Sequence, residues 1–278
     1  MQRETIPLRE ARLEIGDGIA ALIHDRPERR NPMSLTLRQD YTDMLDRVER
    51  DPKIRALIIT GSGGSFCSGG DLGDLKSRVE HPDAPQNSPD AMRRRLLALH
   101  DRVARLRNLE MPVIAAVDGP ALGAGMGLAL VADFVLASPR AFFGMSFAKV
   151  GLVPDMASAY FLPRMVGMSM AKELMLTARK VGAEEAKQLG IVHAIYPHET
   201  LAEQARQFAL RFVEAPPQAM GAMKRMLNSS FETSYGAFVE LEANAQAVAS
   251  TTAYHADALR RFAEGKPLRY DWDRVAKR

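Results

Sequence analysis

An aspartate, Asp155, lies downstream of two glycine-rich turns, and these residue types in this order are typical of an enzyme site. The first turn covers residues 65–71 and the second covers residues 119–125, and each follows a short apolar run. Backbone N–H groups at the start of a helix lack partners, and glycine lets a ligand oxygen approach them closely. We therefore expect the amides of Gly70 and Ala124 to bind an oxyanion at a carbonyl group while Asp155 transfers a proton.

Each of these features also has a purely structural explanation. A Pro-Asp pair before a helical stretch is a common N-cap arrangement, so Asp155 could cap a helix, and either turn could be an ordinary connection. Asp71 has the properties of a turn-former, because aspartate readily hydrogen-bonds to its own backbone. Cys67 has no histidine beside it in the sequence and is expected to be a buried core residue rather than a nucleophile.

The two turns do not match the phosphate-binding motifs of nucleotide-binding proteins. Neither ends in Gly-Lys-Ser or Gly-Lys-Thr, which excludes a P-loop. The second turn also lacks the glycine spacing and the later acidic residue of a dinucleotide-binding fingerprint. No metal is expected either, because five of the histidines have no metal-ligand spacing: His24, His81, His193, His198 and His255.

The length and composition of the chain indicate a protein that folds without disulfide bonds. Its 278 residues can bury a large core, and the single cysteine excludes an intramolecular disulfide and favours a reducing compartment, so the cytoplasm is the expected location. The polar N-terminus and the lack of any apolar run of about 18 residues argue against a signal peptide and a membrane span. A net charge of +3, spread over the whole length, argues against nucleic acid as a partner.

Hydrophobic periodicity predicts an α/β core that would hold the two turns. Residues 12–23 have the pattern of a hairpin, and the apolar runs 54–60 and 113–117 have that of buried central strands. Further short strands are predicted at 134–137 and 192–195. Helices are predicted over residues 34–50, 90–109, 156–166, 169–176 and 183–189. A proline-rich loop at 81–89 could shape a substrate pocket.

Helical patterns replace the β signal from about residue 199 onward. We therefore expect a core that carries the site in residues 1–198 and a C-terminal helical region in residues 199–278. Four helices are predicted there, over residues 201–214, 217–230, 235–249 and 253–264. Apolar positions such as Phe238, Leu241 and Phe262 are numerous for helices at the margin of a core, which favours docking on a partner subunit.

Taken in order, these motifs resemble the crotonase superfamily, the enoyl-CoA hydratase/isomerase family, over about residues 13–267. Residues 66–72 resemble the first oxyanion motif of the family, with the Gly70 amide as donor, and residues 112–125 resemble the second, with the Ala124 amide as donor. Further matches are Gly144, 151–154, 161–167, 183–186 and 190–192. The resemblance implies a ββα superhelical core, an acyl-CoA thioester as substrate, no cofactor beyond that coenzyme A, and a homotrimer or dimer of trimers.

The chain departs from the family hydratases at both of their catalytic glutamates. These two positions fall on Gly127 and Phe147, neither of which can transfer a proton. An acid at Asp155 resembles instead the single-acid isomerases of the family, including those that act on ring-epoxidised phenylacetyl-CoA. The resemblance therefore implies isomerisation of an enoyl-CoA double bond rather than hydration, with Asp155 as both base and acid.

Two alternatives remain open from the sequence. In the 4-chlorobenzoyl-CoA dehalogenases, which Asp155 also resembles, the carboxylate attacks the aryl ring as a nucleophile. His100 aligns with a histidine that helps to hydrolyse the aryl ester there, although one histidine on a polar helix is also typical of a surface residue, and Phe147 replaces a tryptophan of those enzymes. The other alternative is a scaffold that binds CoA or RNA after losing its glutamates.

The resemblance also implies where coenzyme A is bound. Arg30 and Asn31 would lie against its adenine end, and Asp71 and Leu72 belong to the first motif and are expected beside it. Two C-terminal residues, Phe262 and Lys266, match positions that reach the nucleotide, often from the neighbouring subunit. For Lys266, a surface charge at a helix end is an equal alternative.

Overall fold

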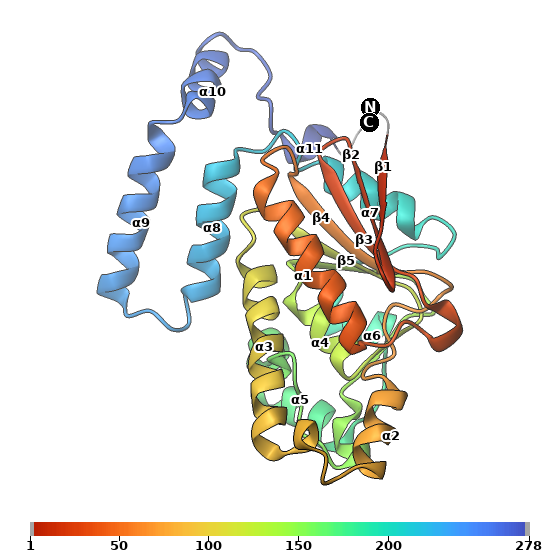
Figure 1. Ribbon diagram of the computed structural model, residues 1–278. Helices are drawn as coiled ribbons and strands as arrows, with labels where there is room; N and C mark the ends of the chain where they lie inside the picture. Colours follow the sequence, from red (N-terminus) through yellow and green to blue (C-terminus); the bar gives the residue numbers. More distant parts are fainter. Residues whose placement is uncertain (1–2, 276–278) are drawn as a thin grey trace.

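A seven-stranded sheet forms the centre of the protein, as seen in the computed structural model, which describes residues 3–275 (Figure 1). The strand order is β1-β2-β3-β4-β5-β7-β10. These strands are β1 (Glu4–Pro7), β2 (Ala11–Gly16), β3 (Ile19–His24), β4 (Ala56–Gly61), β5 (Val113–Val117), β7 (Phe134–Ala137) and β10 (Ala194–Ile195). Strands β1 to β3 are antiparallel, and from β3 to β10 each neighbouring pair is parallel. A smaller sheet contains β6 (Pro120–Leu122), β8 (Phe142–Gly144) and β9 (Val181–Gly182).

The β2–β3 hairpin forms where the sequence predicts it. Asp17 and Gly18 both have positive φ, 54° and 78°, as a tight two-residue hairpin turn requires. The central strands are also confirmed, and β5 is buried along its whole length. Parallel strands that are covered on both faces become continuous apolar runs rather than alternating ones.

The sheet separates two cores, and the alternation along its strands assigns each side chain to one of them. In β4, Leu57 and Ile59 face the larger core, while Ala56 and Ile58 face the smaller one. The larger core is packed by α1 (Leu35–Arg50), α3 (Pro89–Asn108), α4 (Ala124–Val131), α5 (Ser158–Thr177) and α6 (Ala183–Gln188). The smaller core is packed by α7 (Leu201–Leu210). The remaining short elements of the body are η1 (Pro27–Arg29), α2 (Leu72–Glu80), η2 (Pro85–Asn87) and η3 (Ser146–Val150).

Two helices of the larger core begin at serine N-caps. Ser34 accepts a hydrogen bond from the Leu37 amide at the start of α1, and Ser88 does the same for Ala91 in α3. The two helices expected over 156–166 and 169–176 are confirmed as the two parts of α5, which are separated by a kink at Gly167, where φ is 77° and ψ is 160°. Helix α4 was not predicted, because it is buried on every side and therefore has no amphipathic period.

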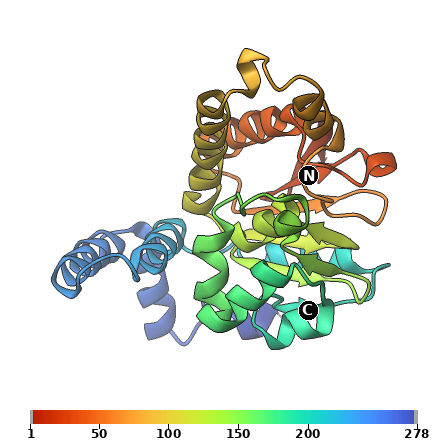
Figure 2. The same cartoon turned by 90° about the horizontal axis from the view of Figure 1, so that it is seen from below.

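The last helices project away from the body (Figures 1 and 2). They are α8 (Pro217–Ser229), α9 (Tyr235–Ser250) and α10 (Ala253–Ala263), after which α11 (Trp272–Val275) lies against α7, where the Trp272 ring packs on Phe208 and Phe212. Helix α7 packs in the smaller core, and the projecting part begins with α8. A stripe of apolar residues on a helix looks the same in sequence whether its own sheet or a partner covers it.

No helix within residues 3–275 is long and apolar enough to cross a membrane.

Candidate active site

The two glycine-rich turns lie side by side in the structure. The Leu122 amide donates to the Cys67 carbonyl and the Cys67 amide donates to the Pro120 carbonyl, both at 3.0 Å. Glycine is required for this approach, because a Cβ at Gly69 would lie 2.9 Å from the Leu122 oxygen, and one at Gly125 would lie 2.2 Å from the Cys67 oxygen. The backbones of segments 67–69 and 120–125 are therefore in direct contact.

Both predicted donor amides lie at the N-terminal ends of helices. Ala124 is the first residue of α4, and Gly70 immediately precedes Asp71, the N-cap of α2. Within residues 3–275, neither the Gly70 nor the Ala124 amide has a hydrogen-bond acceptor. A Cβ at Gly69 would lie 3.9 Å from the Gly123 Cα, so the residues just before the two donors are in contact. Free amides at helix N-termini suit an oxygen that carries negative charge.

Asp155 lies in the loop between η3 and α5, and its side chain does not cap the helix. The N-cap of α5 is Ala157, and it is the Asp155 carbonyl, not the carboxylate, that accepts from the Ser158 amide and hydroxyl, at 3.0 and 2.6 Å. Oδ1 of Asp155 is buried and has no partner within the described chain. Met156 and Ala157 both have positive φ, 54° and 53°. Such strained backbone gathers at functional sites, where surrounding packing holds it in place.

Two basic side chains lie within electrostatic range of the Asp155 carboxylate. Burial raises the pKa of Asp155 above its usual value, and the charges of Arg38 on α1 and His100 on α3 partly offset this rise. The structure thus brings His100 within electrostatic range of Asp155. Arg38 was missed by the sequence analysis, although a signal exists: Arg38 is three residues before buried Tyr41 and seven before buried Leu45, on the apolar stripe of α1.

At the two positions that hold glutamate in family hydratases, this chain has a glycine without free space beside it and a phenylalanine. A Cβ on Gly127 would lie 2.6 Å from the Met156 Cβ and 2.7 Å from the Ser158 Oγ, so that space is already filled. Phe147 lies in η3, and its ring is 3.6 Å from the point where a Cβ on Gly123 would stand. An aromatic wall therefore flanks the second turn.

The residues expected at the adenine end are attached to the first turn. Arg30 is exposed, and its carbonyl accepts from the Ser68 amide and the Ser65 hydroxyl, both at 3.0 Å. The side chain of Asn31 is buried, and its Nδ2 donates to the carbonyls of Ser62 and Ser65 at 3.0 and 2.6 Å. Arg30 can therefore reach a ligand, whereas the Asn31 side chain holds the loop together.

Asp71 and Leu72 mark the start of α2. Oδ1 of Asp71 accepts from the Gly73 and Asp74 amides at 2.7 and 3.3 Å, as expected of a turn-former, and it also pairs with Arg29 at 3.3 Å. Leu72 is 77% exposed, which is unusual for a leucine that neighbours a buried carboxylate. Its side chain is thus available to an apolar part of a ligand beside the first turn.

Phe262 and Lys266 are not brought to these residues within one chain. Phe262 is 78% exposed on α10, and the Lys266 Nζ pairs with Glu264 at 2.7 Å. Both views show α10 far from α2, on the projecting part of the molecule (Figures 1 and 2). A site that contains Arg30 and Phe262 together would require two copies of the chain.

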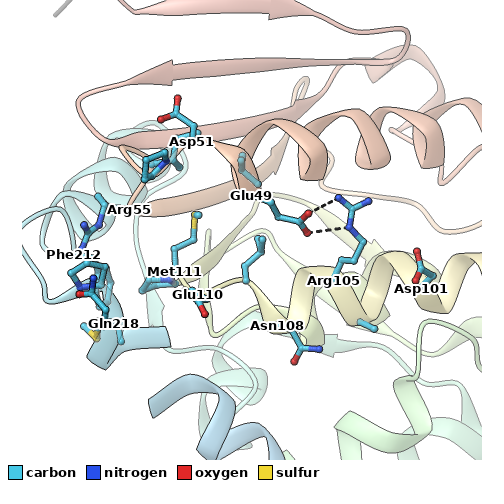
Figure 3. Close-up of a pocket in the computed structure, with 18 residues that line it drawn as sticks. Glu49, Asp51, Arg55, Asp101, Arg105, Asn108, Glu110, Met111, Phe212 and Gln218 are labelled. Carbon is cyan, nitrogen blue, oxygen red and sulfur yellow. Dashed lines mark hydrogen bonds and ion pairs between the residues drawn. The ribbon is translucent and has the colours of Figure 1, made fainter. Parts of the chain in front are cut away.

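A separate pocket lies where the C-terminal halves of α1 and α3 meet the start of α8 (Figure 3). None of the candidate site residues lines it. The guanidinium of Arg105 already pairs with both carboxylate oxygens of Glu49, at 3.0 and 2.7 Å. Among the described residues, none that lines this pocket has a buried polar side-chain atom without a partner, in contrast to Asp155.

Known proteins with similar sequences and structures identify the family of this chain. The sequence model of the enoyl-CoA hydratase/isomerase family matches residues 14–273, and the chain belongs to this family. A crystal structure of an enoyl-CoA hydratase/isomerase from Cupriavidus metallidurans CH34 superposes with a TM-score of 0.89 at 37% identity, covering 95% of this chain and 97% of that one. The fold is accordingly the α/β crotonase fold, as the sequence predicts.

Two named relatives differ in their chemistry. The 1,2-epoxyphenylacetyl-CoA isomerase of Escherichia coli strain K12 is 36% identical over 88% of this chain and 92% of its own length. The 4-chlorobenzoyl coenzyme A dehalogenase-2 of an Arthrobacter species is 31% identical over 80% of this chain and 79% of its own. The family thus establishes an enzyme that processes acyl-CoA thioesters and leaves the particular reaction to be argued from the residues.

Proposed function

We propose that this protein isomerises the double bond of an enoyl-CoA thioester with Asp155 as its single acid/base group. The observation that carries the proposal is that Oδ1 of Asp155 is buried and has no partner within the described residues. In this family member, the two positions of the hydratase glutamates hold Gly127 and Phe147. A single carboxylate can remove a proton and return the same proton elsewhere, which is what isomerisation needs.

In this mechanism the thioester oxygen accepts hydrogen bonds from the amides of Gly70 and Ala124. Asp155 removes a proton from C2 of a 3-enoyl thioester, and the resulting dienolate places its negative charge on that oxygen. Protonated Asp155 then delivers the proton to C4, which yields the conjugated 2-enoyl thioester. Each amide donor contributes about 3 kcal/mol to the lowering of such a barrier, and burial that raises the Asp155 pKa makes the group a better proton acceptor.

Hydration by the two-glutamate route is not supported. That route needs one group to activate water and another to deliver a proton on the far carbon. The space beside Gly127, where a first glutamate would start, is occupied by Met156 and Ser158. A substitution such as Gly127→Glu would have to displace these packed groups before a carboxylate could enter the site.

The test is conversion of 3-hexenoyl-CoA into its conjugated 2-enoyl isomer by the purified protein, followed by absorbance. Asp155→Asn is expected to remove the activity while the circular dichroism spectrum and acyl-CoA binding persist, because asparagine keeps the shape but cannot accept the proton. Normal turnover by the Asp155→Asn variant would refute the assignment.

Dehalogenation of a haloaryl-CoA is the second candidate, and the electrostatic coupling of His100 to Asp155 favours it. In that reaction the Asp155 carboxylate would displace halide from the ring, and His100 would help water to hydrolyse the aryl ester. Halide release from 4-chlorobenzoyl-CoA separates it from isomerisation. A His100→Gln variant should then accumulate the aspartyl ester, which adds the mass of the aroyl-CoA group to the protein. Absence of both halide and adduct excludes this candidate.

The proposed assembly is a homotrimer or a dimer of trimers. Helices α9 and α10 have no buried residues in the single chain. The side chains of Val248, Leu259 and Phe262 are between 57% and 78% exposed. A second copy that covered these helices could bring Phe262 and Lys266 to the CoA site beside Arg30.

A further inference from the structure

Arg38 lies beside Asp155, and neither of the two candidate reactions uses it. Its Nε is buried and has no hydrogen-bond acceptor within residues 3–275. Burial lowers the pKa of Arg38 from its usual value. A buried donor without an acceptor is costly, and native proteins rarely leave one unless a ligand or water completes it.

The surroundings of Arg38 carry an excess of positive charge. Arg78 on α2 and Arg95 on α3 act on it as like charges, while Asp155 and Asp74 act as opposite charges. Arg78 is itself partly buried, which lowers its pKa, and Arg95 lowers that pKa further. Three guanidinium groups therefore share two carboxylates, of which Asp155 must stay free to move a proton.

The cavity beside Arg38 is lined mostly by apolar side chains, with Arg102 as a second arginine. Arg38 lines a small cavity together with Met33, Tyr41, Leu99, Leu128 and Met156. Met33 forms a bridge with Gly70, and Met156 directly follows Asp155, so the cavity adjoins both the first turn and the acid. The far end of an acyl group that extends from the turns past Asp155 would therefore lie near Arg38.

We propose that Arg38 binds a carboxylate at the far end of the acyl group, so that the substrate is a mono-CoA thioester of a dicarboxylic acid. The inference rests on the proposed function and names its substrate class. A carboxylate would satisfy the orphaned Nε and balance the charge shared with Arg78 and Arg95. Arginine suits this task because its planar fork binds both carboxylate oxygens. An alkyl chain would leave the Nε donor buried and unpaired.

The experiment compares two thioesters of equal length, 3-hexenoyl-CoA and 3-hexenedioyl-CoA, which differ only in a terminal methyl or carboxylate. The wild-type enzyme should have a kcat/KM about 10- to 100-fold higher for the diacid, the factor expected for hydrogen bonds to a charged group. Arg38→Met should remove this preference by lowering kcat/KM for the diacid only, measured at a pH where Asp155 is ionised. Arg38→Lys should retain part of it.

Arg102→Met is the matched control. Arg102 lines the same cavity, but its Nε already donates to Thr42 at 2.7 Å, so the preference for the diacid should persist in this variant. Equal losses for both substrates in Arg38→Met, or no loss for either, would overturn the proposal.

A binding measurement separates this proposal from the proposed function. If the wild-type protein isomerises neither thioester, the isomerase assignment fails, and calorimetry with hexanoyl-CoA and hexanedioyl-CoA then decides on Arg38. Tighter binding of the diacid that disappears in Arg38→Met supports the carboxylate site without any turnover. Equal binding of the two saturated thioesters rejects it.

Discussion

At the scale of single residues, the chemistry depends on one carboxylate in an environment that opposes its charge. Asp155 is partly buried, its Oδ1 has no partner in residues 3–275, and two residues with positive φ follow it. Burial raises its pKa, while Arg38 and His100 limit the rise. Such a balance suits a group that accepts a proton and then returns it.

The pH dependence of activity should report this balance. The general base works only when ionised, so kcat/KM for 3-hexenoyl-CoA should rise with pH through the raised pKa of Asp155 and then level off. Arg38→Met removes a charge that lowers this pKa, so its rise should occur at higher pH, with the plateau unchanged. If kcat/KM of Arg38→Met rises at the same pH as in the wild type, or at a lower pH, then Arg38 does not lower the pKa of Asp155.

The same carboxylate should cost stability. Because the pKa of Asp155 is higher in the folded protein than in the unfolded chain, folding favours the protonated form, and stability is lost as pH rises through the folded-state pKa. Asp155→Asn should therefore be more stable at pH 7, by roughly 0.5–2 kcal/mol, the usual size of a single stabilising change. Chemical denaturation measures this, and the gain should shrink at pH 4. A variant less stable than the wild type at pH 7 would show that burial is not the dominant effect.

At the scale of elements, the site depends on two turns that touch through glycine. An isolated β-bridge between Cys67 and Ala121 joins the first turn to the second, and the contact at Gly125 leaves no room for a side chain on that residue. The donor amides of Gly70 and Ala124 are thus positioned by backbone contacts of their neighbours. Protein interiors are close-packed, so a single added carbon at this contact is felt.

A pair of glycine substitutions tests this positioning. Gly125→Ala would place a Cβ 2.2 Å from the Cys67 oxygen, so we expect a loss of stability of about 1–3 kcal/mol or more, together with loss of isomerase activity. Gly236→Ala in α9 is the matched control, because a Cβ there meets nothing within 4 Å. It should leave activity intact and stabilise the protein by up to about 1 kcal/mol. Full activity in the Gly125→Ala variant would argue that the turns are not held by this contact.

At the scale of the whole molecule, α8 fastens the projecting helices to the body. Lys224 on α8 binds the Asp133 carboxylate at 2.6 Å and the Met111 carbonyl at 3.0 Å. Beyond α8, Val239, Leu241 and Val248 on α9 are 39–61% exposed. An exposed apolar surface of this kind is typical of an interface.

The mass in solution should therefore exceed that of one chain. Light scattering is expected to give a trimer or twice a trimer, and Leu241→Glu should reduce the mass because a charge is costly in an apolar interface. Glu242→Gln, one residue away, is the control and should leave the mass unchanged. A monomeric wild-type protein would contradict the proposed assembly.

Features that depend on near neighbours were predictable from the sequence. The β2–β3 hairpin, the Ser34 and Ser88 caps and the buried central strands follow from turn residues, capping side chains and apolar periods within a few positions. The fold class was predictable as well, because several motifs of the family follow one another in the right order.

Contacts between distant segments were decided only by the tertiary structure. The convergence of Arg38, His100 and Asp155, the filling of the space beside Gly127 by Met156, and the packing of α7 on its own sheet all join residues far apart in the chain. Helical periodicity predicts that a face is buried but not which surface covers it. Likewise, the sequence does not show which group a charged side chain in an apolar stripe will contact, because that contact forms only in the packed core. The sequence alone therefore determined the fold class and the acid candidate, whereas packing decided what surrounds that acid.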